Sequence, residues 1–226
     1  MDFSHVTVWI FDLDNTLYPP ETALFPQIEA RMTDYVMDLL GVDRAHADHL
    51  RAEYWRQHGT TLAGLMAQHQ IDAGDYLARV HDIDFGALRP DPALNDAIAA
   101  LPGRKIVHTN ADAGYAGQVL ARRGVSGFDG VYGIAETGFH PKPDARAYDA
   151  VLAAADIDPT HAAFFEDDPR NLIVPDVMGM RTVLVGPGRH GPDALPVGTQ
   201  HGAHVQFQTD DLTAFLRAIV AGRHGG

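Results

Sequence analysis

Two aspartates, Asp12 and Asp14, directly follow a run in which five of six residues are apolar (VTVWIF, residues 6–11). An apolar run that is rich in β-branched and aromatic residues predicts a buried strand. A buried carboxylate is costly unless it has a partner, so two carboxylates at the tip of such a strand indicate a functional role. Asn15 and Thr16 continue the polar stretch, in the sequence FDLDNTLYPP.

Three further groups of polar residues lie at or after strand-like runs later in the chain. Thr109 ends the run KIVHT, Lys142 lies between two prolines, and residues 166–168 are Glu-Asp-Asp. Lys142 stands out because the chain has only one other lysine, Lys105. Carboxylates of this kind suit a hard cation such as magnesium, and a lysine with a hydroxyl suits a phosphate. The residue types therefore indicate a site for these two groups.

The periodicity of the apolar residues predicts the strands and helices that must position these groups. The expected strands cover residues 6–11, 105–109, 131–134, 162–165, 181–185 and 204–207. The expected helices cover residues 25–40, 44–58, 62–70, 73–81, 113–123, 144–155, a segment that begins near residue 169, and 211–220. Residues 186–202 are rich in Gly and Pro and are expected to form a loop.

The order of these elements predicts an α/β fold. Strands and helices alternate after residue 89, which is typical of a Rossmann-like, doubly wound parallel sheet with helices on both faces. The first four helices form an inserted helical cap after the first strand. We therefore expect a catalytic core of residues 1–18 and 89–226 and a cap of residues 19–88. Because ligands bind at the carboxyl ends of the strands in such sheets, the polar groups should converge on one edge.

The bulk composition excludes several classes of protein. The formal net charge of −13 argues against a nucleic acid polymer as partner, because that affinity depends on Lys and Arg. The absence of cysteine excludes disulfides and thiolate metal sites. No apolar stretch approaches the roughly 20 residues of a membrane span, and the N-terminal MDFSHV has no signal-peptide pattern. We expect a cytoplasmic protein without a membrane partner.

The motif Asp-Leu-Asp-Asn-Thr, then Thr109, the proline-flanked Lys142 and the acidic Glu-Asp-Asp resemble, in this order, the four motifs of the haloacid dehalogenase (HAD) superfamily. The resemblance covers the whole chain and includes the helical cap. It implies that Asp12 is the nucleophile, which forms an aspartyl-phosphate. It also implies that Asp14 protonates the leaving oxygen and later deprotonates the attacking water. The substrate phosphate would be held by Thr109, Asn110 and Lys142.

The same resemblance implies Mg²⁺ as the cofactor. The ion would bind the Asp12 carboxylate, the Asp14 main-chain carbonyl and Asp167, with Glu166 acting through water. Asp168 precedes a proline, and this pair is typical of a helix N-cap and first helical residue, so we assign Asp168 a structural role.

The implied function is a magnesium-dependent phosphatase that acts on a small phosphorylated metabolite. Asp14 argues against a dehalogenase, which does not need this acid, and the cap contains no lysine for the Schiff base of phosphonate-cleaving relatives. The segments FDLDNTLYP and GTTLAGL are similar to the pyrimidine 5′-nucleotidase branch, which implies a pyrimidine nucleoside 5′-monophosphate as substrate. Phosphoglycolate, sugar phosphates and a β-phosphoglucomutase-like phosphomutase reaction stay open. The alternatives outside enzymes are a phospho-Asp receiver and a degenerate binding module.

The choice of substrate is expected to lie in the cap, which can close over the mouth of the phosphate site. Residues 54–65, YWRQHGTTLAGL, carry aromatic and polar side chains. From this segment we select Arg56, His58 and Thr60 as candidate contacts to the leaving group. Trp55 fits the internal packing of the cap equally well.

Overall fold

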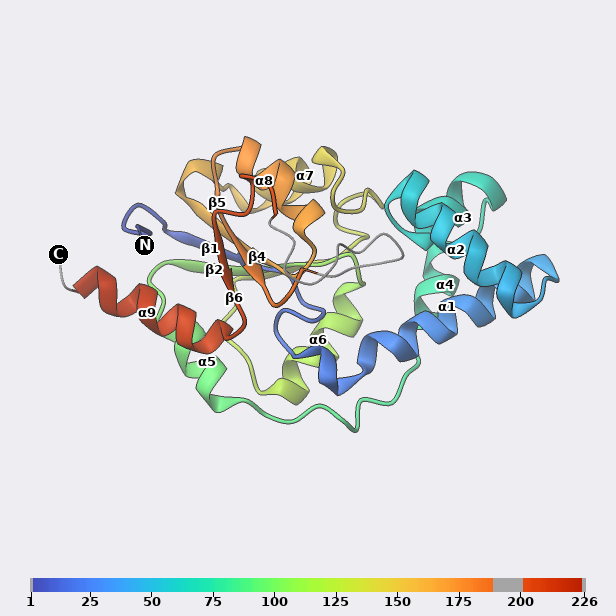
Figure 1. Ribbon diagram of the computed structural model, residues 1–226, viewed down its shortest axis with the longest axis horizontal. Helices are drawn as coiled ribbons and strands as arrows, with labels where there is room; N and C mark the ends of the chain where they lie inside the picture. Colours follow the sequence, from blue (N-terminus) through green and yellow to red (C-terminus); the bar gives the residue numbers. More distant parts are fainter. Residues whose placement is uncertain (1, 189–200, 225–226) are drawn as a thin grey trace.

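A computed structural model describes residues 2–188 and 201–224 of the chain. Its centre is a six-stranded parallel sheet with the strand order β3-β2-β1-β4-β5-β6 (Figure 1). The strands are β1 Val8–Phe11, β2 Arg104–His108, β3 Gly130–Tyr132, β4 Ala162–Glu166, β5 Arg181–Val185 and β6 Phe207–Thr209. The chain moves outward from β1 to β3 on one side and from β4 to β6 on the other. The topological switch point, where ligands bind in such sheets, therefore lies between β1 and β4.

Helices cover both faces of this sheet (Figure 1). One face carries α5 Pro92–Ala99, α6 Ala113–Arg123 and α9 Leu212–His224, and the other carries α7 Ala145–Ala155 and α8 Ile173–Val177. Three short 3-10 helices are η1 Pro20–Thr22, η2 Pro159–His161 and η3 Pro169–Leu172.

The side chains of β1 alternate between the two layers that the helices form on the sheet. Trp9 and Phe11 belong to the layer with α5, α6 and α9, where Phe11 stacks on Phe165 with ring centroids 4.8 Å apart. Ile10 packs in the opposite layer with Phe164. Burial of each such side chain contributes roughly 1.5–3 kcal/mol to stability. The strand that leads into the two aspartates is thus held from both sides.

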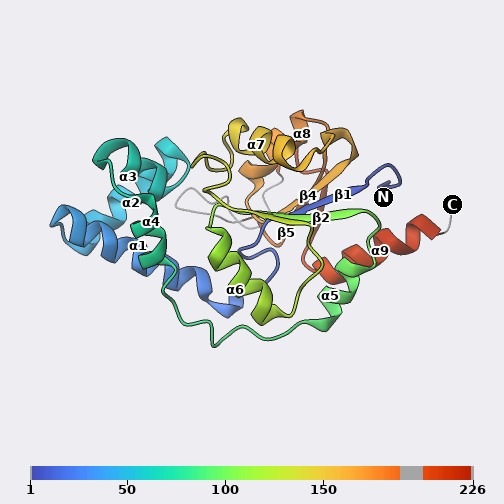
Figure 2. The ribbon, with the colours of Figure 1, turned by 180° about the vertical axis from the view of Figure 1, so that it is seen from behind.

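Four α-helices are inserted between β1 and α5 and lie beside the carboxyl ends of the strands (Figures 1 and 2). They are α1 Leu24–Leu40, α2 Arg44–His58, α3 Thr61–His69 and α4 Ala73–Val80. Gly41 and Gly59 end α1 and α2 with φ angles of 66° and 86°, in the left-handed region that favours glycine. Asp43 and Thr60 cap the starts of α2 and α3 with their side chains. No helix in the described part of the chain is long and apolar enough to cross a membrane.

The expected α/β fold with a helical insertion after the first strand is confirmed. Several bounds differ from the expectation by a few residues, and two elements depart from it further. The last strand covers Phe207–Thr209 instead of residues 204–207, and α5 does not appear among the expected helices. Asp91 caps α5 and Pro92 is its first residue, a pair that is typical of a helix start. Of the expected loop, residues 189–200 lie outside the described residues.

Arg123, at the end of α6, ties together the two segments that connect the sheet to the insertion. Its guanidinium donates to the main-chain oxygen of Leu17, at 3.2 Å, on the outgoing segment and to that of Arg89, at 2.7 Å, on the returning one. It also pairs with Asp91 at 2.6 Å, and only 9% of the Arg123 side chain is exposed. This one side chain therefore fixes where the insertion leaves and rejoins the core.

We predict that Arg123→Met lowers the free energy of unfolding by about 3 kcal/mol, because it leaves two carbonyl oxygens and a partly buried carboxylate without their donor. Urea denaturation measures the change. The matched control is Arg146→Met, because Arg146 pairs with Asp144 at the surface with 66% of its side chain exposed. Such a pair contributes less than about 1 kcal/mol. Equal effects of the two substitutions would contradict the anchoring role of Arg123.

Candidate active site

The carboxyl ends of β1, β2 and β4 bring the polar residues of the sequence motifs to one edge of the sheet. Phe11 pairs in register with Val107 of β2 and with Phe165 of β4, so Asp12 lies level with the ends of both neighbouring strands. This edge faces a cavity of ≈ 390 Å³ that the insertion closes from the other side. The cavity is lined by all the motif residues selected from the sequence: Asp12, Asp14, Thr109, Asn110, Lys142, Glu166 and Asp167.

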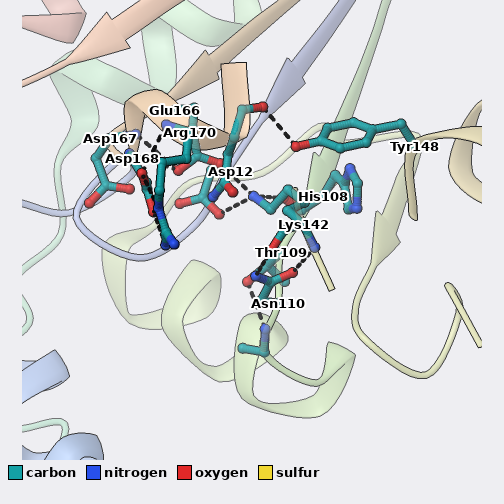
Figure 3. A network of polar contacts seen from close by, with 12 residues as sticks. Asp12, His108, Thr109, Asn110, Lys142, Tyr148, Glu166, Asp167, Asp168 and Arg170 are labelled. Carbon is teal, nitrogen blue, oxygen red and sulfur yellow. Dashed lines mark hydrogen bonds and ion pairs between the residues drawn. The ribbon is translucent and has the colours of Figure 1, made fainter. Parts of the chain in front are cut away.

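The ammonium group of Lys142 lies at the centre of this cluster (Figure 3). Its Nζ donates to Asp12 Oδ1 at 2.7 Å, to Glu166 Oε2 at 2.6 Å and to the main-chain oxygen of His108 at 2.9 Å. These acceptors occupy all three N–H donors of the lysine, and its side chain is only 1% exposed. Lys142 thus offsets two buried carboxylates, which would otherwise be very costly.

Burial dominates the ionisation of this cluster. It raises the pKa of Asp12 to about 7, with repulsion from Glu166 adding to the shift and attraction by Lys142 opposing it. Burial also raises the pKa of Glu166 to about 7, again against the attraction of Lys142. For Lys142 burial alone would lower the pKa, but the two carboxylates outweigh it and raise the pKa above its ordinary value. One lysine therefore does not fully compensate two acids, and a further cation would favour their ionised forms.

Asn110 and Thr109 organise the loop that follows β2. The Asn110 side chain accepts from Lys142 N at 2.8 Å and donates to Lys142 O at 3.1 Å, so it fixes the main chain on both sides of the lysine side chain. Thr109 Oγ1 accepts from Ala111 N at 3.0 Å, which leaves the hydroxyl hydrogen to act as a donor. Both residues face the cavity, and their contact with a phosphate stays a prediction.

Asp12, Glu166 and Asp167 form a buried group that could hold a metal ion, with one carboxylate oxygen from each lying within 4.8 Å of the others. Oxygen donors alone suit a hard cation, so the residues present fit magnesium. Glu166 Oε1 accepts from the main-chain N–H groups of Asp167 and Asp168, both at 3.1 Å, and its other oxygen accepts from Lys142. The protein thus engages both oxygens of Glu166, and direct contact of Asp12 and Asp167 with a metal stays a prediction.

Asp168 has the expected structural role at the start of η3. Its Oδ1 accepts from Arg170 N at 3.0 Å, and its carboxylate pairs with the Arg170 guanidinium at 2.6 Å. The same guanidinium lies 3.4 Å from the ring centroid of Trp55, in α2 of the insertion. Trp55 and Arg170 both line the cavity, so a cation–π contact joins the insertion to the acidic turn.

The side chain of Asp14 contacts two tyrosines that are not among the residues selected from the sequence. Its Oδ1 accepts from the Tyr18 hydroxyl at 2.5 Å and from the Tyr115 hydroxyl at 2.7 Å. Burial raises the pKa of Asp14, and these two hydrogen bonds oppose the shift. Tyr18 lies only four residues from Asp14 in the sequence, and this short spacing is a signal that the two side chains could meet. Tyr115 has no such signal, because it lies on α6, 101 residues farther along the chain.

The insertion supplies the outer wall of the cavity. The residues of α2 on this wall lie at helical spacing and so share one face: Asp48, Arg51, Ala52 and Trp55. Apolar side chains of α1, α3 and α4 complete the wall: Phe25, Ile28, Met32, Leu62, Leu77 and Val80. A leaving group in the cavity would therefore contact apolar side chains together with the charged side chains of Asp48 and Arg51.

The three cap residues selected from the sequence occupy different places. Thr60 lines the cavity, and its Oγ1 also caps α3 by accepting from Ala63 N at 3.1 Å. Arg56 is exposed, and His58 Nε2 lies 3.4 Å from Gln68 Nε2. The roles of Arg56, His58 and Thr60 in substrate choice stay predictions. Arg51 is not among the residues selected from the sequence, but it lines the cavity.

Solved structures with low sequence identity share this fold. The similarity to L-2-haloacid dehalogenase from Xanthobacter autotrophicus with chloropropionic acid covalently bound covers 95% of this chain and 98% of that one, with a TM-score of 0.58 and 14% identity. The HAD-hydrolase YfnB from Bacillus subtilis, bound to magnesium, is similar over 95% of this chain and 98% of its own, with a TM-score of 0.55 and 14% identity.

Sequence comparisons identify the family. Phosphate metabolism protein 8 from Saccharomyces cerevisiae is 26% identical over 196 residues, which are 78% of this chain but only 60% of that relative's length. The family model of haloacid dehalogenase-like hydrolases matches residues 6–174, a range that contains Asp12, Lys142 and the acidic turn. The chain therefore belongs to the haloacid dehalogenase-like hydrolases.

Proposed function

We propose that the protein is a magnesium-dependent phosphatase that hydrolyses a small phosphomonoester through an aspartyl-phosphate on Asp12. The observation that carries the proposal is the position of Lys142 between Asp12 and Glu166, at 2.7 and 2.6 Å, beside the carboxylate of Asp167. A carboxylate and a phosphate repel each other, so an attacking carboxylate needs positive charge close to it. Lys142 supplies that charge, and the covalent intermediate replaces one difficult displacement by two easier ones.

In this proposal Asp12, Asp167 and the main-chain carbonyl of Asp14 hold the magnesium ion, with Glu166 acting through water. When bound, the ion supplies positive charge that stabilises the transferring phosphoryl group. The raised pKa values of Asp12 and Glu166, both about 7, support the need for a second cation beside Lys142.

Asp14 is the proposed acid and base. It gives a proton to the leaving oxygen while Asp12 attacks phosphorus, and it later takes a proton from the water that hydrolyses the aspartyl-phosphate. Burial holds the pKa of Asp14 above that of an exposed aspartate, which increases the protonated fraction that the first step needs. Thr109, Asn110 and Lys142 are the proposed contacts of the substrate phosphate, because they face the same cavity.

The proposed substrate is a phosphomonoester with a leaving group of nucleoside size, such as a pyrimidine nucleoside 5′-monophosphate. The cavity of ≈ 390 Å³ lies within the roughly 300–1,000 Å³ of sites for ligands of that order of size. Residues 1–18 and 89–226 would carry the chemistry, and residues 19–88 would choose the substrate. Phosphoglycolate and sugar phosphates are the alternative substrates. A phosphomutase would return the phosphoryl group to its substrate, and a receiver or binding module would show no turnover.

We predict that Asp12→Asn lowers the release of inorganic phosphate from 4-nitrophenyl phosphate, with magnesium present, by roughly 10⁴-fold or more, the order seen when a nucleophile is removed. Asp149→Asn, which changes an exposed aspartate of α7, is the matched control and should keep full activity. Circular dichroism checks that both variants keep the fold. Substantial turnover by Asp12→Asn would remove Asp12 from the role of nucleophile.

We also predict that magnesium stabilises the protein without any substrate. An ion that binds only the folded state at a hundred times its Kd adds about 2.7 kcal/mol to the free energy of unfolding, and a thermal melt with and without magnesium measures this gain. Asp167→Asn should abolish most of the gain, because it removes a direct ligand, whereas Asp149→Asn should keep it. A full gain in Asp167→Asn would rule out Asp167 as a ligand.

The wall of the cavity generates a third test, which uses three arginines of α2. Arg51 lines the cavity, donates to Thr33 Oγ1 at 2.8 Å and is only 16% exposed. Arg56 is exposed, and Arg44 pairs with Asp34 at the surface. The three positions therefore differ in their access to a leaving group while they share one helix and one charge.

We predict that Arg51→Met lowers kcat/KM for cytidine 5′-monophosphate by about tenfold or more, which is about 1.4 kcal/mol of transition-state binding. It should leave the hydrolysis of acetyl phosphate, which is too small to reach α2, within about twofold. Arg44→Met is the control and should change neither substrate, and Arg56→Met tests the residue selected from the sequence. An equal loss on both substrates in Arg51→Met would show that Arg51 does not contact the leaving group.

A further inference from the structure

The carboxylate of Asp14 is held by two buried tyrosines that the reaction outlined above does not use. The Tyr18 and Tyr115 hydroxyls donate to the same oxygen, Oδ1, at 2.5 and 2.7 Å, and the two hydroxyl oxygens lie 3.4 Å apart. Both tyrosines are 1% exposed. Tyr18 comes from the segment that leaves β1, and Tyr115 comes from the first turn of α6, so two separate elements meet at one carboxylate oxygen.

Burial favours the neutral form of both hydroxyls, in which each carries a hydrogen that it can donate. Burial raises the pKa of Tyr18 and of Tyr115, and the nearby Asp14 adds to both shifts. A neutral phenol in contact with a carboxylate donates its hydrogen to that carboxylate. Since a carboxylate oxygen has two lone pairs, two donors fill the hydrogen-bonding capacity of Oδ1.

The ring of Tyr115 is itself held by neighbouring groups. His81, at the end of α4, stacks on it with ring centroids 4.3 Å apart and an angle of 19° between the planes. The His81 Nδ1 lies 2.5 Å from Asp112 Oδ2, and Asp112 in turn caps α6 by accepting from Tyr115 N at 2.8 Å. The ring of Phe85 lies 5.8 Å from that of Tyr115. The direction of the Tyr115 hydroxyl is therefore set by the core and by the last helix of the insertion together.

We propose that Tyr18 and Tyr115 are positioning residues that hold Asp14 by Oδ1, so that Oδ2 is the oxygen presented to the substrate. The inference rests on the proposed function, in which Asp14 transfers the proton. As Asp12 forms its bond to phosphorus, the bond from phosphorus to the leaving oxygen breaks and the proton moves from Oδ2 to that oxygen. In the second step the oxygen of a water attacks phosphorus, the bond from phosphorus to the Asp12 oxygen breaks, and Oδ2 takes a proton from that water, so inorganic phosphate and the Asp12 carboxylate are released. Neither tyrosine gains or loses a proton in this sequence.

The dependence of the rate on the leaving group tests this role. An alkoxide is a poor leaving group and needs the proton of Asp14, whereas 4-nitrophenolate leaves readily without one. The measured quantity is the ratio of kcat/KM for cytidine 5′-monophosphate to that for 4-nitrophenyl phosphate. A merely structural defect lowers both rates together and leaves this ratio unchanged. Asp14→Asn serves as the reference, because it removes the acid completely and so shows the largest change in the ratio that loss of the acid can produce.

We expect Tyr18→Phe and Tyr115→Phe each to lower the ratio by about 3- to 10-fold, and the double variant by about 10- to 100-fold, part of the 10²–10⁴-fold that a general acid contributes. The control is Tyr54→Phe, which removes a buried hydroxyl that lies 2.8 Å from His69 Nε2 in the insertion. It should leave the ratio unchanged. If the double variant does not fold, the two single variants still decide, because each keeps one donor to Asp14.

Two results would overturn the inference. One is a parallel loss on both esters in the Tyr18 and Tyr115 variants, which would make the tyrosines structural. The other is an unchanged ratio in Asp14→Asn, which would mean that Asp14 transfers no proton to the leaving group. Failure of the proposed function is a separate result, because the unaltered protein would then hydrolyse neither ester.

Discussion

The burial of the Lys142 ammonium group is the constraint on which the rest of the site depends. An ammonium group that is removed from water needs an acceptor for each of its hydrogens. The acceptors are Asp12, Glu166 and the main-chain oxygen of His108, which come from the ends of three neighbouring strands. The parallel register of these strands is therefore a condition for the burial of the lysine. Asn110 holds the main-chain N–H and C=O of Lys142 with its side-chain amide. Removing one partner of a buried ion pair lowers the stability of a protein by about 3–5 kcal/mol.

Much of the fold could be predicted because strong local patterns agree with the final packing. The residues of β1 are apolar and buried on both faces, and the helix Ala113–Arg123 has a clear period and a glycine stop, so both are found from the sequence. The strand Phe207–Thr209 overlaps the expected strand, residues 204–207, at one residue only, because it pairs only at the edge of the sheet and is only partly buried. The helix Pro92–Ala99 is missed, because its proline start signal adjoins another proline in the connection from the insertion.

The residues of the candidate site could be predicted where they follow strand ends. They were much harder to predict where the orientation of a helix determines which side chains line the cavity. Strand ends meet at one edge of a parallel sheet, so Asp12 and Glu166 could be grouped without coordinates. In α2 the cavity is reached by Arg51 and Trp55, four residues apart, whereas Arg56 lies one residue farther and is exposed. The sequence contains this spacing but does not say which face of the helix turns inward. Tyr115 reaches its carboxylate only through the packing of α6 against the segment after β1.

Asp12 and Asp14 are two residues apart, yet their surroundings differ in kind. Asp12 contacts the positive charge of Lys142, and Asp14 contacts the neutral hydroxyls of Tyr18 and Tyr115. In the protein alone this difference does not separate their roles, because burial raises the pKa of both carboxyl groups. In the proposed mechanism a magnesium ion contacts the side chain of Asp12 but only the main chain of Asp14. The ion would then favour the carboxylate form of Asp12 much more strongly than that of Asp14. The cation would thereby make Asp12 a nucleophile while Asp14 can still carry a proton, which is how two neighbouring carboxyl groups can serve two functions.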